Sequence, residues 1–182
     1  VHGKCLLGMF QTVDFTSLSF LGFTGKDDNR NGVLFPVKIQ GKFARYDRPN
    51  KVELDSGVFS GNQIWYSESD DLIHWTPKEM VMDGRLHYWD ENIGAGPPPI
   101  KTKEGWLLVY HGIAMHYQPI YQVGVALLDL DEPWRVISRG RYNILEPREI
   151  WETIGQVPNV VFPSGIIVDA IDVDGFATSD SA

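Results

Sequence analysis

A pattern of short strands and turns recurs along this chain with a period close to 60 residues. Turns at Asp14, Asp71 and Asp131 are each followed by a short apolar or alternating segment, and these aspartates are 57 and 60 residues apart. A repeat of this length, holding about four short strands, is typical of one blade of a β-propeller. Because a blade cannot bury its faces alone, the pattern predicts an all-β chain that supplies about three blades of a closed ring.

Six segments are predicted to be strands because they are short, apolar or alternating, and bounded by Gly, Pro, Asp or Asn. The 18 glycines and 11 prolines also favour turns over long helices. The chain opens close to a strand and lacks an initiator methionine, so we expect the N-terminal blades to lie upstream and residues 1–182 to form one partial propeller domain. The predicted strands are Lys4–Thr12, Lys42–Asp47, Gln63–Ser69, Trp106–His111, Val123–Asp129 and Val160–Val168.

Charge and composition narrow the classes of partner. The net charge of −8 makes the chain a poor general binder of nucleic acids and anionic membranes. No apolar run approaches the roughly 20 residues of a membrane-spanning helix. The single cysteine, Cys5, cannot form an internal disulfide, and no spaced set of ligands predicts a metal site. We therefore expect no metal, no cofactor, and no nucleic-acid or membrane partner.

Two basic residues hold matching positions in a second alignment of the repeat. Arg48 lies 12 residues after Pro36, and His111 lies 12 residues after Pro99. Equivalent positions of successive blades point toward one axis, so an arginine fork and an imidazolium are expected to converge there as a site for a phosphate dianion. The alternative is a surface salt bridge between Arg48 and Asp47, with His111 as an ordinary strand residue.

The segment between Ile93 and Ile100 is the most unusual in composition. Its Gly94-Ala95-Gly96 run permits close approach of the backbone to a ligand. The three prolines that follow fix a rigid, extended backbone. We interpret the segment as the rim of a sugar pocket; the alternative is a rigid connection between blades.

Aromatic side chains near that rim are candidates for sugar contacts. Trp89 could stack on a sugar ring, and Tyr110 and Tyr121 could hydrogen-bond sugar hydroxyls, although all three could instead belong to the core. Glycoside cleavage normally uses two carboxylates, and none stands out here from spacing alone. Since phosphate is already an anionic nucleophile and needs only one acid, the pattern favours phosphorolysis. The carboxylates considered are Asp47, Asp90, Glu91 and Asp129.

Five motifs occur together along the chain. They are Asn29–Pro36, Asp47–Pro49, Ile93–Ile100, Gly105–Gly112 and Val157–Pro163. Together they resemble glycoside hydrolase family 130, and the resemblance covers almost the whole chain. It implies a five-bladed β-propeller with its site at the mouth of the axis. It also implies inverting phosphorolysis of β-mannosides to α-mannose 1-phosphate, the activity of most members, while some members are hydrolases.

The resemblance assigns roles to individual residues. Arg30, Arg48 and His111 fall on the motif positions of the phosphate-binding cluster, with Asn92 and Lys101 nearby. Asn92 stands where the family often has a lysine, which weakens the expected cluster by one charge. The residues expected to hold sugar are Asp90, Gly94, Ala95, Gly96, Tyr110 and Tyr121.

The general acid of the family is an aspartate in a motif that precedes the matched part. We therefore expect it upstream and assign the role to no residue here. Retention of both arginines and the histidine favours a phosphorylase; the alternatives are a β-mannoside hydrolase and a non-catalytic carbohydrate-binding propeller fragment. The expected substrates are a mannose-containing oligosaccharide and inorganic phosphate, in a cytoplasmic enzyme that could be a homo-oligomer. The acceptor sugar and the linkage are left open.

Overall fold

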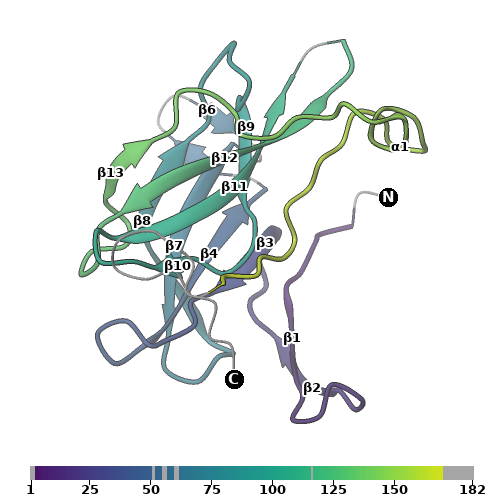
Figure 1. Cartoon of the computed structure of the whole chain (residues 1–182). Helices are drawn as coiled ribbons and strands as arrows, with labels where there is room; N and C mark the ends of the chain where they lie inside the picture. The colour runs from purple at the N-terminus through teal and green to yellow at the C-terminus, as the bar shows by residue number, and fades with distance from the viewer. Residues whose placement is uncertain (1–2, 51, 55–56, 60–61, 116, 170–182) are drawn as a thin grey trace, which may run out of the picture.

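The computed structural model describes residues 3–50, 52–54, 57–59, 62–115 and 117–169, and almost all of its regular structure is β-strand (Figure 1). This confirms the predicted all-β class. No helix in the described part of the chain is long and apolar enough to cross a membrane. The elements are β1 (Gly8–Gln11), β2 (Ser19–Phe23), β3 (Asn29–Leu34), β4 (Phe43–Pro49), β5 (Val52–Leu54), β6 (Gly57–Phe59), β7 (Gln63–Ser69), β8 (Trp75–Asp83), β9 (Asn92–Ala95), β10 (Ile100–Lys101), β11 (Trp106–Ala114), β12 (Ile120–Leu128), β13 (Val136–Arg139) and α1 (Ile150–Thr153).

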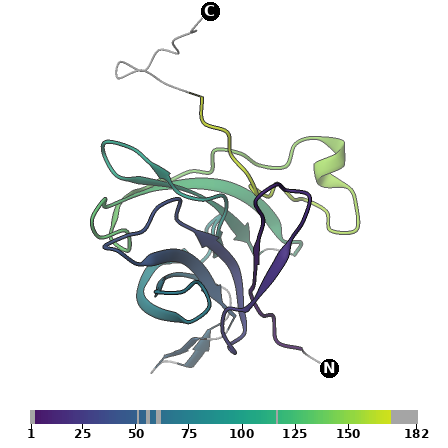
Figure 2. The ribbon, with the colours of Figure 1, turned by 90° about the horizontal axis from the view of Figure 1, so that it is seen from below.

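Two antiparallel sheets carry most of these strands. The first sheet has the order β3-β4-β7-β8. In the second, β9 and β10 pair with successive parts of β11, followed by β12 and β13. Neighbouring strands follow each other along the chain, apart from the separate β5–β6 hairpin, so each sheet is a meander. Figure 2 shows the second sheet, in teal and green, lying over the first, in blue.

Aromatic side chains fill the space between the two sheets. Tyr46 and Tyr66 of the first sheet are fully buried, and Trp106 of the second is almost so. The Phe35 ring joins them, with its centroid 4.8 Å from that of Tyr46 and 5.0 Å from that of Trp106. The Tyr46 hydroxyl donates to the carbonyl oxygen of Pro133 at 2.6 Å, so its polar end is satisfied. This packing holds the two sheets face to face. It thereby also fixes the relative positions of the strands that carry the site residues.

The predicted repeat is visible as a recurring turn. Asp14 between β1 and β2, and Asp71 between β7 and β8, each accept backbone hydrogen bonds from the second and third residues that follow. The next residue in each turn, Phe15 and Leu72, has a positive φ, 56° and 70° respectively. The first two copies of the repeat therefore agree in backbone conformation as well as in spacing.

The third copy of the turn is centred on Asp129. The prediction that Asp131 is its centre is therefore wrong. Asp129 Oδ1 accepts the backbone hydrogen bonds of the second and third residues after it, between β12 and β13. Four residues separate Asp129 from Trp134, three separate Asp71 from Trp75, and two separate Asp131 from Trp134. Because the spacing between the turn aspartate and the tryptophan differs between copies, a sequence comparison anchored on the tryptophans does not identify the turn aspartate.

The predicted strand at Val160–Val168 is also wrong. The segment is extended, but it joins a sheet only through a single parallel bridge between Val160 and Tyr121. Pro163 interrupts any further ladder because it has no backbone N–H to donate. The segment instead crosses the face of the second sheet, where the ring of Phe162 lies 4.4 Å from that of His111.

The register of the sheets corrects the equivalence of Arg48 and His111. The backbone N–H of Phe35 donates to Ala44, and that of Gly96 donates to Val109, at corresponding points of the two sheets. Counted from these bonds, His111 corresponds to Tyr46, two residues before Arg48. The two basic residues therefore occupy equivalent faces of their sheets, but not equivalent positions.

Candidate anion-binding site

Arg30 on β3 and Arg48 on β4 are directly opposite each other in the strand register. Like charges in such a pair are destabilising unless something neutralises them. Within the described residues, neither guanidinium forms an ion pair with a carboxylate. Burial, and then the charge of Arg30, lower the pKa of Arg48, while Tyr121 acts in the opposite direction. A bound anion would relieve this repulsion.

Asp47 does not neutralise the neighbouring Arg48. Adjacent residues of a strand point to opposite faces, and Asp47 lies with Arg45 on the other face of β4. There its Oδ2 accepts from Arg45 Nε at 2.9 Å and from Ser67 Oγ at 3.0 Å. The alternative salt bridge between Arg48 and Asp47 is therefore wrong. The Nε of Arg48 is buried and has no hydrogen-bond partner in the part of the chain that the structure describes.

His111 on β11 reaches Asn31 of the first sheet across the backbone of β9. Its Nε2 lies 3.1 Å from Asn31 Nδ2, which brings the imidazole next to the strand that carries Arg30. The contact passes over Gly94, the strand partner of His111. A Cβ at Gly94 would lie 2.5 Å from Cε1 and 2.6 Å from Nε2 of His111, well inside van der Waals contact. The convergence of the two sheets therefore depends on a glycine at position 94.

The imidazole of His111 is neutral at physiological pH. The side chain is 1% exposed, and burial together with the charge of Arg48 lowers its pKa to about 3. The expectation that an imidazolium adds positive charge to the site is therefore wrong. The positive charge comes from the arginines, and His111 offers one donor and one acceptor. Its Nδ1 is buried without a partner among the described residues.

Two aromatic rings flank His111. The ring of Tyr121 lies nearly parallel to the imidazole at 6.3 Å, and the ring of Phe162 lies at 4.4 Å. Tyr121 shares this face of the second sheet because it pairs with Ile113, two residues beyond His111. Phe162 remains 47% exposed. The structure thus brings Tyr121, a predicted sugar contact, next to the basic group, which consists of Arg30, Arg48 and the neighbouring His111.

The predicted contacts on and after β9 are divided between its two faces. Asn92 and Gly94 lie on the same face of β9. The half-buried Asn92 is therefore two residues along the strand from Gly94, which His111 contacts. Gly96 is covered by Pro163, whose carbonyl oxygen would be 2.9 Å from a Cβ there. Ala95 points the other way and belongs to the hydrophobic core. Asn92 and Gly94 therefore adjoin the group, whereas Ala95 does not.

Asp90 and Tyr110 lie in the interior, away from the group. Asp90 is fully buried, and its carboxylate accepts from Arg85 Nε and Nη2 at 2.8 Å each and from Arg139 Nη2 at 2.6 Å. The Tyr110 hydroxyl donates to the same carboxylate at 2.8 Å. Tyr110 points to the opposite side of β11 from His111, since neighbouring residues alternate. The structure does not bring these two predicted sugar contacts to the basic group.

Trp89 packs on this interior network. Its ring is stacked on that of Tyr110 at 5.8 Å, and its Nε1 donates to the carbonyl oxygen of Arg141 at 3.0 Å. The ring fits because Gly112 and Gly124 have no side chains; a Cβ at Gly112 would lie 2.6 Å from a ring carbon. In this structure Trp89 is a packing residue, as the alternative interpretation proposed.

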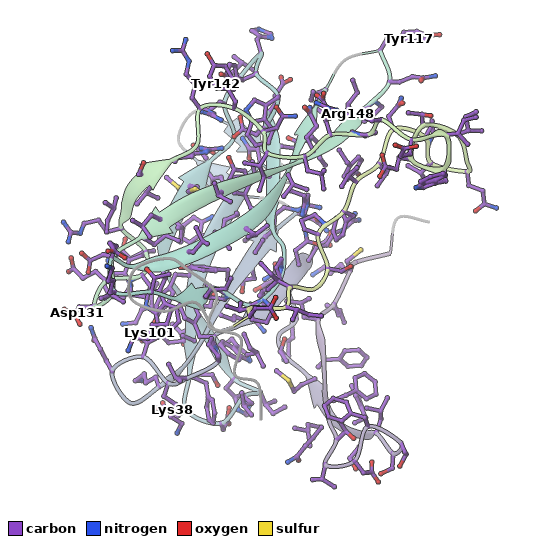
Figure 3. All side chains as sticks on the ribbon, viewed as in Figure 1. Lys38, Lys101, Tyr117, Asp131, Tyr142 and Arg148 are labelled. Atoms are coloured by element: carbon purple, nitrogen blue, oxygen red, sulfur yellow. The ribbon has the colours of Figure 1, made fainter. Side chains whose placement is uncertain are left out.

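Lys101 does not lie near the arginines, so the expectation that it joins the phosphate-binding cluster is wrong. It pairs with Trp106 at the start of β11, five residues before His111. At a rise of about 3.3 Å per residue, the two positions are about 16 Å apart along the strand. The Lys101 ammonium lies 5.8 Å from the centre of the Trp106 ring. Figure 3 shows Lys101 on the left of the molecule, on the same side as Asp131.

Asn31 and Phe162 adjoin the site, although the sequence assigned neither of them a role there. Asn31 has a φ of 52° beside a register shift in β3, a conformation that asparagine tolerates better than most residues. The Asn31-Gly32 dipeptide was the available signal for this irregularity. Phe162-Pro163 begins a third copy of the pattern seen at Phe35-Pro36, and Phe162 lies in the Val157–Pro163 motif, but neither signal predicted its contact with His111.

The fold and the site define an all-β protein in which two sheets bring a neutral histidine to a pair of arginines without carboxylate partners among the described residues. Such a group suits an oxyanion. Residues 18–173 match the family model of glycoside hydrolase family 130, described as beta-1,4-mannooligosaccharide phosphorylase. Since the match covers most of the chain, the chain belongs to glycoside hydrolase family 130, which confirms the resemblance seen in its motifs.

Relatives within the family carry phosphorylase names. The chain is 41% identical over 174 residues to the beta-1,4-mannooligosaccharide phosphorylase of Ruminococcus albus, covering 92% of this chain and 49% of that protein. It is 39% identical over 140 residues to the 1,2-beta-oligomannan phosphorylase of a Thermoanaerobacter species, covering 76% and 43%. The structure of beta-1,2-mannobiose phosphorylase from Listeria innocua in complex with beta-1,2-mannobiose matches with a TM-score of 0.80 and 35% identity, over 90% and 44%. The chain thus spans about half the length of the curated relatives it matches.

Proposed function

We propose that the complete protein is an inverting β-mannoside phosphorylase that releases α-mannose 1-phosphate. The observation that carries this proposal is the opposed pair Arg30 and Arg48, which has no carboxylate partner among the described residues. Relatives named as phosphorylases of β-1,4- and β-1,2-linked mannosides support it. We further propose that the complete protein is a five-bladed propeller; the recurring Asp turns and the two packed meanders of this chain support that architecture.

The arginines would act by holding and orienting the phosphate. Charge-assisted hydrogen bonds from Arg30 and Arg48 place one phosphate oxygen in line with the anomeric carbon. The new carbon–oxygen bond forms on one face of the sugar while the glycosidic bond breaks on the other, so the configuration inverts. The departing oxygen takes a proton from an acid. The buried carboxylates Asp47 and Asp90 are already held in ion pairs, so we assign the role of the acid to neither of them.

The second substrate is proposed to be a mannose-containing oligosaccharide. Tyr121 and the partly exposed Phe162 present aromatic surface beside His111, of the kind on which a sugar ring can pack. Asn92 offers an amide on the same side of β9. Inorganic phosphate is a co-substrate in this scheme, and no cofactor is required. A cytoplasmic location is proposed because the cell supplies phosphate there and retains the sugar phosphate.

The proposal is tested with the complete protein on β-1,4-mannobiose and on mannosyl-glucose, each with and without phosphate. We expect mannose 1-phosphate only when phosphate is present. Arg48→Ala should raise the KM for phosphate roughly 10- to 150-fold, the equivalent of losing one hydrogen bond to a charged group. Arg148→Ala is the matched control, because Arg148 is exposed and pairs with Glu146. An unchanged phosphate dependence in Arg48→Ala would refute the assignment.

Two other functions give different outcomes in the same assay. Free mannose released at full rate without phosphate would identify a β-mannoside hydrolase, for which Asn92 in place of a lysine is the supporting feature. Binding of mannoside without any turnover would identify a carbohydrate-binding propeller. That alternative is supported by Asp47 and Asp90, whose carboxylates are occupied by arginines.

A further inference from the structure

The contact between Asn31 and His111 defines which ring nitrogen carries the proton. An amide Nδ2 has two hydrogens to donate and does not accept. At 3.1 Å from His111 Nε2, it therefore makes Nε2 the acceptor. A neutral imidazole that accepts at Nε2 carries its proton on Nδ1.

The backbone holds Asn31 in this role. Its φ of 52° lies at the register shift of β3, so its side chain leaves the strand at an angle that a regular pair would not allow. Gly94 keeps the path to His111 clear, because a Cβ there would collide with both partners. The two sheets thus bring an amide donor to one specific nitrogen of a buried ring.

The other ring nitrogen, Nδ1 of His111, is buried, and nothing in the described part of the chain hydrogen-bonds to it. A buried donor left unpaired is destabilising, and such an atom in a native structure calls for an explanation. The Nε of the neighbouring Arg48 likewise has no hydrogen-bond partner among the residues that the structure describes. Both atoms are donors, so the unmet requirement at this place is for an acceptor.

We propose that Asn31 is a positioning residue that locks His111 in the tautomer with its proton on Nδ1, so that the ring offers a donor to an oxyanion held by Arg30 and Arg48. The identity of that anion as phosphate rests on the proposed function, whereas the tautomer does not. With His111 fixed in this way, all three residues present donors to the anion. The site then suits the acceptor oxygens of an oxyanion such as inorganic phosphate or sulfate.

The tautomer is measured directly by long-range ¹H–¹⁵N correlation spectra of the complete protein labelled at histidine. The His111 signals are identified by their loss in His111→Gln. Without phosphate, we expect Nε2 to show the shift of a lone-pair nitrogen and Nδ1 that of a protonated one. The reverse pattern, or averaged shifts for both nitrogens, would overturn the proposal.

Two substitutions at Asn31 test whether it sets the tautomer. Asn31→Asp places a carboxylate at the contact, which can only accept, so the proton should move to Nε2. Asn31→Gly keeps the positive φ and removes the amide, so the two shifts should become averaged. Asn143→Asp is the matched control, since the Asn143 amide donates to Gln122 Oε1 at 2.9 Å and does not touch His111. Wild-type shifts in Asn31→Asp would also overturn the proposal.

Phosphate is then added to the wild-type protein to separate the two hypotheses. We expect the Nδ1 signal to shift as phosphate binds, and sulfate to compete for the same change. An Nδ1–H tautomer that depends on Asn31 but does not respond to either anion would support the role of Asn31 and contradict the phosphate site.

Discussion

An added methyl group at Gly94 would meet both Asn31 and His111, with the imidazole atoms at 2.5 and 2.6 Å. Gly94→Ala should therefore push the two sheets apart at the site, at a cost of about 1–3 kcal/mol, as for overpacking in a core. We also expect phosphate affinity to fall, because the histidine moves away from the arginines. Gly165→Ala is the control, since a Cβ there meets nothing within 4 Å. Urea unfolding and phosphate titration measure the two effects, and wild-type values for both would show that the glycine is dispensable.

At the scale of one turn, Asp71 closes the hairpin between β7 and β8. Its carboxylate accepts from the side chain of His74 and from the backbone N–H groups of His74 and Ile73, and these bonds hold its pKa well below the usual range. A lowered pKa in the folded state gives stability that is present above the unfolded value, about 3.9, and is lost as pH falls through the folded value. Asp71→Asn should therefore lower the thermal midpoint at pH 7 more than at pH 2. Asp70→Asn is the control, because among the described residues the exposed Asp70 carboxylate bonds only to Lys42. Equal effects of Asp71→Asn at both pH values would contradict the role of the turn.

Elements of this fold were predictable where the sequence encodes them locally. The turns at Asp14 and Asp71 depend on side chains that bond to the next residues, so a 57-residue spacing was enough to find them. The prediction of a strand at Val160–Val168 was wrong because an apolar composition is typical both of a strand in a sheet and of an extended segment that pairs with no neighbouring strand. Whether such a segment joins a sheet depends on the edge it meets, and Pro163 prevents that here.

The composition of the candidate site depends on the whole molecule. Arg30 and Arg48 were assigned together through the family resemblance, and the structure shows them opposite each other on adjacent strands of one meander. The sequence could not show that Asp90 and Tyr110 lie outside the site. A shift of one residue along a strand moves a side chain from the face with the site to the face in the interior. Asn31 could not be anticipated, since its contact requires a register shift in one sheet and a glycine in the other.

The buried, neutral state of His111 makes the stability of the whole molecule sensitive to mild acid. The unfolded chain binds a proton at this residue near pH 6.5, whereas the folded protein does so only near pH 3. The unfolded state thus gains the proton first, and the free energy of unfolding should fall as pH drops below 6.5, by about 2 kcal/mol between pH 7 and pH 5. Urea unfolding across this range measures the slope. His111→Gln should flatten it, and His87→Asn, at an exposed loop position with positive φ, should not. A wild-type protein equally stable at pH 5 and pH 7 would mean that His111 can take up a proton in place, so that the site carries a third positive charge.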